Sequence, residues 1–176
     1  IKNFINAGSK DEIVFTKNAT ESINLVATTF GQQNIQKGDE ILITELEHHS
    51  NYVPWHYLRE TRGAVIKFAP IDENGDIIID KLKELITSKT KIISVTHVSN
   101  VTGTIVPIKD IVEIAHKKNI PVLVDGCQSA PHIKINVKDL DCDFYVISCH
   151  KVYGPTGVGI LYAKKKWLEK LPPYIG

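Results

Sequence analysis

The chain has 176 residues, of which 43% are hydrophobic and 23% are charged, and its formal net charge is +1. This length suffices for one soluble domain with a sizeable core, and so small a charge excludes a long-range field that would attract nucleic acid or an anionic membrane. No apolar run is long enough to span a bilayer, and the N-terminus lacks a basic-then-apolar signal pattern.

The cysteines are three in number, Cys127, Cys142 and Cys149, and no two of them have C-x-x-C spacing. A disulfide framework or a zinc site is therefore not expected. The adjacent His48 and His49 do not form the H-x-x-x-H pattern with which a helix binds zinc, so a zinc protein is the least supported interpretation. We predict a protein of the reducing cytoplasm without a metal site.

Strand-like and helix-like segments alternate along the chain. Apolar and β-branched runs predict strands, and apolar residues three or four positions apart predict helices. We expect Gly31 to end the first helix, Pro54 to lie in the first turn of the second with Gly63 beyond its end, and Asp80 to cap the third. In chain order, the expected elements are strand 12–16, helix 20–30, strand 39–44, helix 51–62, strand 64–71, a helix from Asp80 carrying Leu82, Leu85 and Ile86, strand 91–98, helix 107–118, and strands 122–125, 144–149 and 158–163.

Near-continuous apolar strands separated by amphipathic helices predict an α/β fold, in which a mostly parallel sheet is covered by helices on both faces. In such sheets, ligands bind outside the carboxyl ends of the strands. The polar residues that follow each strand are therefore the candidates for a site. They form five clusters, at residues 18–21, 47–49, 97–100, 125–128 and 148–151.

The most informative of these residues is Lys151, which follows an apolar strand and precedes a glycine-rich loop. A lysine amine at the mouth of a buried strand is placed to act as a nucleophile. Asp125 ends another apolar strand upstream. A lysine and an acid at two strand ends indicate a site for a cofactor that forms a Schiff base.

Pyridoxal phosphate needs a lysine amine, a carboxylate on its pyridine nitrogen, a group over the ring face and donors for its phosphate. Lys151 and Asp125 match the first two needs, and His48 is suited to stack on the ring and shuttle protons. Thr20 and the backbone N–H groups of Ala19 and Thr20 are suited to hold phosphate at the start of a helix.

The amides of Asn100 and Gln128 are candidates to donate to the ring hydroxyl oxygen. Each residue alone has a plainer interpretation. Lys151 fits a surface lysine and Asp125 a helix cap or turn residue. Thr20 fits a plain N-cap, and a loop histidine is commoner than a catalytic one. The cofactor interpretation depends on their occurrence together.

Together these residues resemble a known family. The chain is similar to the class V, fold-type I pyridoxal-phosphate enzymes, and within them to the SUF-pathway (group II) cysteine desulfurases, which overlap in sequence with selenocysteine lyases. The resemblance covers nearly the whole chain, and the last of its segments is the most specific. The segments that carry it are residues 16–26, 47–55, 96–103, 124–129 and 141–162.

The resemblance implies a three-layer αβα fold, the large domain of a fold-type I transferase. It implies that Lys151 forms the Schiff base, that Asp125 pairs with the pyridinium nitrogen, and that His48, which follows the acidic Glu47, stacks on the ring. It also implies that Gln128 and Asn100 contact the ring oxygen or the substrate. The residues implied to bind phosphate are Thr20, Ser148 and His150.

The resemblance further implies the conversion of L-cysteine to L-alanine in a homodimer, with the sulfur passed as a persulfide to an acceptor protein for iron–sulfur cluster assembly. The sequence departs from the family at Cys127 and Cys149, where members usually carry alanine or a similar small residue and glycine, respectively. It also has Asn18 and Ala19 before Thr20, where a Gly-Thr or similar pair is more usual.

The chain begins at Ile1 and stops at a turn-like sequence, residues 172–176, so we expect a piece of a longer protein. Residues 1–176 would then be an incomplete cofactor-binding large domain, without the family's N-terminal arm and small C-terminal domain. None of the three cysteines matches the sulfur-accepting one, and the arginine that grips the substrate carboxylate is also expected beyond this sequence. We therefore expect little sulfur transfer from this chain alone. The alternatives are a selenocysteine lyase or another class V enzyme, and a non-catalytic split-gene remnant.

Overall fold

A seven-stranded sheet runs through the computed structural model, which describes residues 1–175. The last residue of the predicted turn-like sequence, Gly176, lies outside the described residues. The strands are β1 (Ile13–Thr16), β2 (Glu40–Thr44), β3 (Val65–Ala69), β4 (Thr90–Thr96), β5 (Val122–Asp125), β6 (Phe144–Ser148) and β7 (Gly159–Ala163). Their spatial order is β1-β7-β6-β5-β4-β2-β3.

The sheet is mostly parallel, as predicted. Strand β7 is antiparallel to both of its neighbours, β1 and β6, and every other pair in the sheet is parallel. Strand β1 therefore runs in the same direction as β6, although the two do not touch. The carboxyl ends of β1, β2, β4, β5 and β6 consequently share one edge of the sheet, together with the start of β7.

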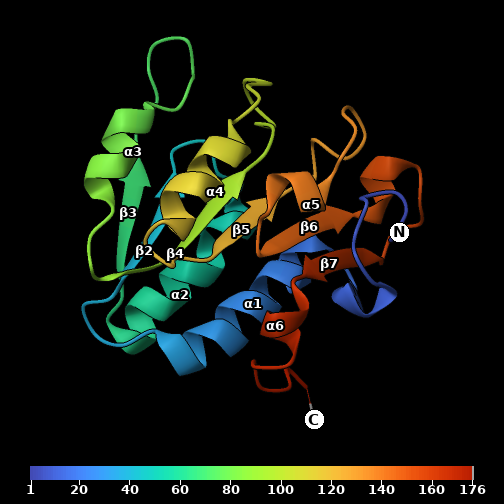
Figure 1. Ribbon diagram of the computed structural model, residues 1–176, viewed down its shortest axis with the longest axis horizontal. Coiled ribbons are helices and arrows are strands. Elements are labelled where there is room, and N and C mark those ends of the chain that lie inside the picture. Colours follow the sequence, from blue (N-terminus) through green and yellow to red (C-terminus); the bar gives the residue numbers. More distant parts are fainter. Residues whose placement is uncertain (176) are drawn as a thin grey trace.

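Helices cover both faces of the sheet, which confirms the predicted three-layer α/β architecture (Figure 1). One layer holds α1 (Ala19–Asn34), α2 (Val53–Arg62) and α6 (Lys165–Leu168), and the other holds α3 (Ile79–Leu85), α4 (Ile108–His116) and α5 (Val137–Leu140). Three short 3-10 helices, η1 (Lys10–Glu12), η2 (His49–Asn51) and η3 (Cys149–Val152), complete the described elements.

The core forms two hydrophobic clusters, one on each face of the sheet. Successive side chains of a strand point to opposite faces. Thus Leu42 of β2 packs toward α3 and α4, while Ile41 and Ile43 pack toward α1 and α2. Strands buried on both faces need apolar residues at nearly every position, which is why they are visible in the sequence as continuous apolar runs.

Several predicted helix ends differ from those in the structure, and two of them, at Gly31 and Asp80, differ for a specific reason. Helix α1 continues past Gly31 to Asn34, because this glycine serves close packing rather than helix termination. A Cβ at Gly31 would lie 2.7 Å from Cδ2 of Leu58 in α2. Asp80 is not a cap but lies in the first turn of α3, since the N–H of Ile78 is held by the carbonyl of Pro70 and the helix begins directly after it.

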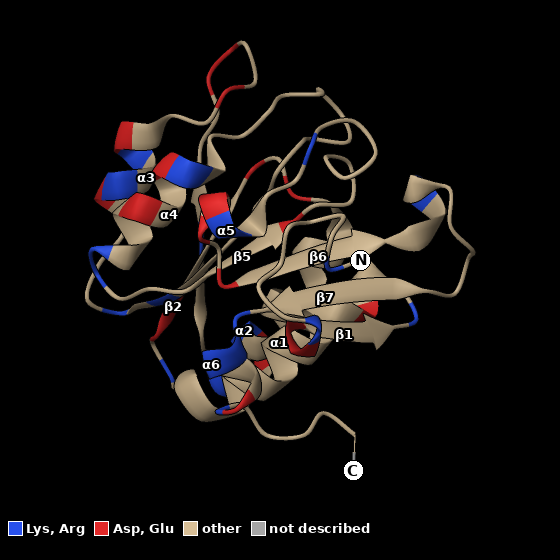
Figure 2. Cartoon of the chain, turned by 45° about the vertical axis from the view of Figure 1, so that its right-hand side comes forward, with Lys and Arg blue, Asp and Glu red and all other residues tan. Residues whose placement is uncertain are grey.

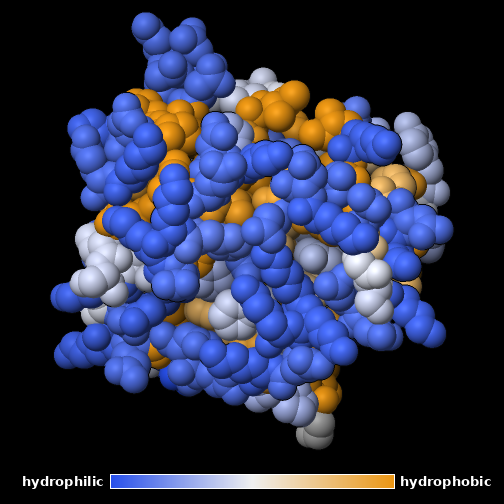
Figure 3. All heavy atoms as spheres, viewed as in Figure 1, coloured by the Kyte–Doolittle hydropathy of each residue, from blue (hydrophilic) through white to orange (hydrophobic). Residues whose placement is uncertain are grey.

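The surface carries mixed charge. Basic and acidic residues are interspersed along α3, α4 and α5 (Figure 2), and the face seen in Figure 3 is mainly hydrophilic, with hydrophobic groups visible between the helices. Within residues 1–175, no helix has the length and apolar character needed to cross a bilayer. Of the lysines that follow β7, Lys164 and Lys166 form ion pairs with Asp141 and Asp143, respectively.

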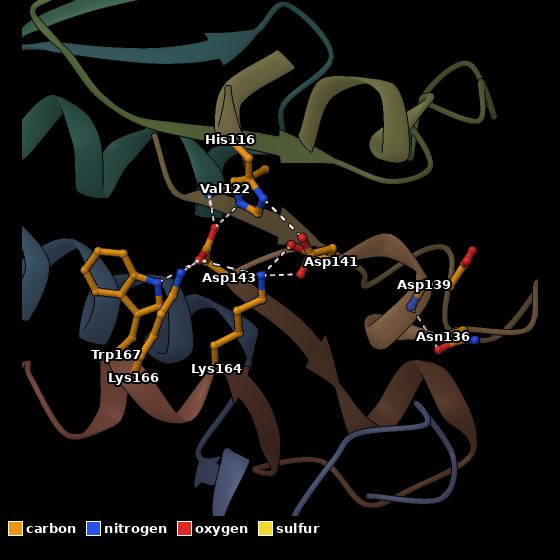
Figure 4. Close-up of polar contacts among 9 residues, drawn as sticks. All are labelled: His116, Val122, Asn136, Asp139, Asp141, Asp143, Lys164, Lys166 and Trp167. Carbon is orange, nitrogen blue, oxygen red and sulfur yellow. Dashed lines mark hydrogen bonds and ion pairs between the residues drawn. The ribbon is translucent and has the colours of Figure 1, made fainter. Parts of the chain in front are cut away.

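A buried carboxylate joins three elements at the sheet edge opposite the predicted site (Figure 4). Asp143, just before β6, accepts hydrogen bonds from Nε2 of His116 at 2.8 Å, the N–H of Val122 at 3.0 Å and Nε1 of Trp167 at 2.8 Å. Nζ of Lys166 adds an ion pair at 3.1 Å. Burial alone would raise the pKa of Asp143, but the hydrogen bonds from Trp167, His116 and Val122 hold it below its ordinary value.

We expect Asp143→Asn to lower the free energy of unfolding by about 3 kcal/mol, because the amide faces donors that it cannot satisfy. Urea denaturation at neutral pH measures this change. Above its ordinary pKa of 3.8, the carboxylate contributes its full stabilisation of the fold. This stabilisation is lost as the pH falls below 3.8 toward the lower pKa of the folded state.

The matched control is Asp139→Asn, which removes an exposed ion pair with Lys109. It should change the free energy of unfolding by less than about 0.5 kcal/mol. Equal effects of the two substitutions would contradict a special contribution from Asp143.

Candidate active site

A cavity of about 360 Å³ opens at the carboxyl edge of the sheet, a size typical of small-molecule sites. All nine residues predicted for the site line it, although they come from five separate segments. They are Ala19, Thr20, His48, Asn100, Asp125, Gln128, Ser148, His150 and Lys151. Of the other lining residues, Asn18, Val98 and Cys127 belong to the predicted strand-end clusters, whereas Ser50 and Thr96 lie outside them.

Asp125 ends the central strand β5 and is only 4% exposed. In the sheet it pairs with Thr96 of β4 on one side and Val146 of β6 on the other, so its position is fixed by the register. One carboxylate oxygen accepts a hydrogen bond from the N–H of Cys127 at 3.0 Å. The next residue is glycine for a steric reason, since a Cβ at Gly126 would lie 2.0 Å from the ring of Tyr145.

Lys151 is half-buried and lies in η3, the 3-10 helix that continues directly from β6. The end of β6 is fastened to the start of α1, because Oγ of the buried Ser148 accepts a hydrogen bond from the N–H of Ala19 at 3.1 Å. Strand β7 approaches the same point closely. A Cβ at Gly159 would lie 2.3 Å from the backbone carbonyl carbon of Asn18, so only glycine fits there.

The start of helix α1 borders the cavity. Asn18, not Thr20, is its N-cap, and the side chain of Asn18 accepts from the N–H of Glu21 at 2.8 Å. Thr20 therefore does not cap the helix and lies exposed in its first turn. The N–H groups of a first turn have no partners within the helix. The helix dipole adds partial positive charge, so this corner of the cavity favours an anion.

Three of the remaining lining residues, His48, Asn100 and His150, are exposed, whereas Gln128 is half-buried. Nδ1 of His48 lies 2.8 Å from Oγ of Ser50 and accepts from the N–H of Ser50 at 3.2 Å, which leaves the proton on Nε2. The cavity thus combines an amine, a buried carboxylate, an imidazole and a helix N-terminus.

Comparison with known proteins identifies the family. The family model described as aminotransferase class-V matches residues 1–176. The chain belongs to this family. A probable cysteine desulfurase of Halalkalibacterium halodurans is 51% identical over 173 residues, and a cysteine desulfurase of Cronobacter sakazakii is 49% identical over 173 residues. Each alignment covers 98% of this chain and 43% of the relative, so the chain spans less than half the length of these relatives.

Solved structures agree with this assignment. The cysteine desulfurase CsdA from Escherichia coli superposes with a TM-score of 0.97 at 40% identity, covering 99% of this chain and 44% of that one. A cysteine desulfurase from Thermococcus onnurineus superposes with a TM-score of 0.92 at 38% identity, covering 98% of this chain and 42% of that one. The fold of this class-V chain therefore matches less than half of each longer enzyme.

The half-buried Glu47 of this class-V chain did not stand out in the sequence beyond its place before His48. It accepts hydrogen bonds from Thr44, Asn51 and the backbone N–H of Thr96. Burial raises its pKa to about 8, and these three hydrogen bonds oppose the rise. No pattern in the sequence shows that a glutamate accepts three hydrogen bonds, which is why only the structure reveals this one.

A second buried chain of polar groups lies behind Asp125 in this class-V domain. Nδ1 of His97 lies 2.9 Å from the hydroxyl of Tyr145, which lies 2.6 Å from Oγ of Ser129. His97 also donates its backbone N–H to the carbonyl of Asp125 at 2.9 Å. Burial lowers the pKa of His97 to about 4, so its ring is neutral at physiological pH.

We expect acid to destabilise the protein through His97, which is 6% exposed. The unfolded chain takes up a proton near the ordinary pKa of 6.5, whereas the folded chain does so only near 4. The stability is therefore complete above about pH 6.5 and falls by up to about 3 kcal/mol as the pH is lowered toward 4.

Urea denaturation over this pH range checks the prediction. His97→Gln, which does not titrate, should flatten the pH dependence, whereas the exposed control His132→Gln should not. Identical pH dependence in all three proteins would contradict the role of His97.

Proposed function

We propose that this chain is the pyridoxal-phosphate-binding large domain of a cysteine desulfurase. The observation that carries the proposal is the shared cavity, which all nine predicted residues line. The relatives named above are 51% and 49% identical to nearly the whole chain and support the assignment as a cysteine desulfurase. The chain spans less than half their length, so the reaction of the whole enzyme is part of the proposal.

The residues of the cavity fit the proposed cofactor. Its donor set complements an aldehyde, a pyridine nitrogen, a ring face and a phosphate, and it contains one lysine and one buried carboxylate, Lys151 and Asp125. Gly126 and Gly159 keep the strand ends close, since a Cβ at either would collide with its neighbours. Pyridoxal phosphate supplies an aldehyde carbon for an amine and a ring that withdraws electrons from a substrate carbon.

The roles that we propose follow from the chemistry of each side chain. Lys151 would hold the cofactor through its amine, with water as the leaving group, and Nζ, once displaced by the amino group of the substrate, would take the α-proton of the amino acid. The carboxylate of Asp125 keeps a proton on the pyridine nitrogen. The ring of His48 covers one face of the cofactor and excludes water from it.

We propose that the phosphate lies at the N-terminus of α1, where Thr20, Ser148 and His150 contribute side-chain donors. The N–H of Ala19 already donates to Ser148, so in this domain Ala19 contributes indirectly, by orienting the serine. Asn100 and Gln128 are proposed to contact the ring oxygen or the substrate.

The proposed substrate is L-cysteine, whose carbon–sulfur bond is broken to yield L-alanine while the sulfur passes to a cysteine thiol. We also propose a homodimer and a sulfur-acceptor protein as partners, as the resemblance implies. The three cysteines of this chain are buried and free, and burial raises the pKa of each thiol. Since the attacking species is a thiolate, we propose that the accepting thiol is none of these three.

The cofactor assignment is tested by incubating the protein with pyridoxal phosphate, reducing with borohydride and locating the label by mass spectrometry. We expect label on Lys151 and a visible absorbance band before reduction, because a lysine amine and the aldehyde form a coloured adduct. Lys151→Ala should lose both signals. The exposed control Lys134→Ala should keep both. Label that is absent from the wild type, or that persists in Lys151→Ala, would falsify the assignment.

The desulfurase assignment is tested by complementation. The part of the Halalkalibacterium halodurans relative that this chain does not match, produced as a separate polypeptide, is mixed with the chain and pyridoxal phosphate. We expect alanine release from L-cysteine by the mixture and none with Lys151→Ala. A complex that forms by light scattering, binds the cofactor and still releases no alanine would count against the activity.

A further inference from the structure

Among residues 1–175, the exposed His48 has hydrogen-bond partners only in its own segment. Its Nδ1 contacts Ser50, and its carbonyl accepts from the N–H of Asn51 at 2.8 Å. These contacts lie within one short segment and do not attach that segment to the sheet. What fixes His48 at the cavity must therefore act through the half-buried Glu47 and the fully buried Asn51, which lie on either side of it.

Glu47 attaches the segment to two strand ends. One carboxylate oxygen accepts from Oγ1 of Thr44, the last residue of β2, at 2.6 Å, and from the N–H of Thr96, the last residue of β4, at 2.9 Å. These strands are neighbours in the sheet (Figure 1). The other oxygen accepts from Nδ2 of Asn51 at 2.6 Å. Glu47 does not itself line the cavity that His48 lines.

The direction of the bond between Glu47 and Asn51 is fixed by a third group. Oδ1 of the fully buried Asn51 accepts from Nε1 of Trp55 at 3.2 Å and from Oγ of Ser94 at 2.6 Å. An indole N–H only donates, so the amide of Asn51 must present its oxygen to Trp55 and its nitrogen to Glu47. Position 47 therefore faces donors at both of its oxygens, and the ionised carboxylate present above its pKa of about 8 accepts from all of them.

We propose that Glu47 is a positioning residue, which holds His48 against the cofactor ring by anchoring its segment to β2 and β4. The inference rests on the proposed function, because it needs pyridoxal phosphate in the cavity. Glu47 touches neither cofactor nor substrate in this role. A glutamate that merely stabilised the fold would affect unfolding but would not act on the cofactor through His48.

Glu47→Gln tests the inference with almost no change in volume. In either orientation, the introduced amide nitrogen faces a donor, since neither Asn51 nor the N–H of Thr96 can accept from it. We expect pyridoxal phosphate binding, measured at about pH 9 by titrating its visible absorbance, to weaken about tenfold, because Glu47 is ionised above its pKa of about 8. Glu60→Gln, on the exposed face of α2, is the matched control and should bind like the wild type.

A double-mutant cycle with His48→Ala separates positioning from general stability. In the His48→Ala background, Glu47→Gln should weaken binding by less than about twofold, because the group that it positions is gone. The same loss in both backgrounds would overturn the inference. A wild type that fails to bind pyridoxal phosphate would instead refute the proposed function.

Exchanging the acid and the amide between positions 47 and 51 tests whether cofactor binding can be rescued. Combining Glu47→Gln with Asn51→Asp lets the amide at position 47 donate to the new carboxylate, which still accepts from Trp55 and Ser94. We expect this double variant to fold and to bind within about threefold of the wild type. It also covers the case in which Glu47→Gln alone does not fold. A folded double variant that binds about tenfold more weakly than the wild type would overturn the inference.

Discussion

The register of the three central strands is the constraint on which the site depends. Thr96 of β4 lies opposite Asp125 of β5, which lies opposite Val146 of β6. Strands β4 and β5 end at these paired residues and β6 ends shortly beyond them, at Ser148, so the polar residues that follow the three strands meet at one edge. A slip of one residue would turn Asp125 to the other face of the sheet and expose apolar residues that now fill the core. The packing of the two hydrophobic clusters therefore specifies the cavity as strongly as any residue in it.

Buried polar groups reinforce this register. A polar group taken from water is costly unless it is hydrogen-bonded, and within residues 1–175 no buried side-chain nitrogen or oxygen lacks a partner. His97 and Tyr145 support the turn after β5, and Glu47 and Asn51 support the segment after β2. The exposed groups at the cavity therefore lie on segments whose neighbouring polar groups satisfy their hydrogen bonds in a single conformation. Such networks favour a single conformation more than they add stability.

Much of this was predictable from the sequence, because apolar strands and the polar residues after them are local patterns. The nine residues of the predicted site do line one cavity, and their roles remain predictions. Gly31 was misjudged because a helix end and a close helix contact both call for glycine, and only the position of Leu58 distinguishes them. Glu47 was missed because its hydrogen bonds follow from the sheet, which brings Thr96 to it from a distant part of the chain. Non-local contacts of this kind leave no pattern in a single sequence.

The thiols suggest how the proposed chemistry is divided. Cys127 lines the cavity beside Asp125 and close to Lys151, yet burial and the nearby carboxylate both raise its pKa. A site that must keep a carboxylate ionised against the ring nitrogen is unfavourable for a second negative charge, so it suppresses a thiolate there. The charges that suit the cofactor therefore keep a thiol in the cavity lining protonated and prevent it from accepting sulfur. An accepting thiol has to approach the substrate from outside this charge arrangement, which makes the cofactor core and the sulfur acceptor physically separate parts of the proposed enzyme.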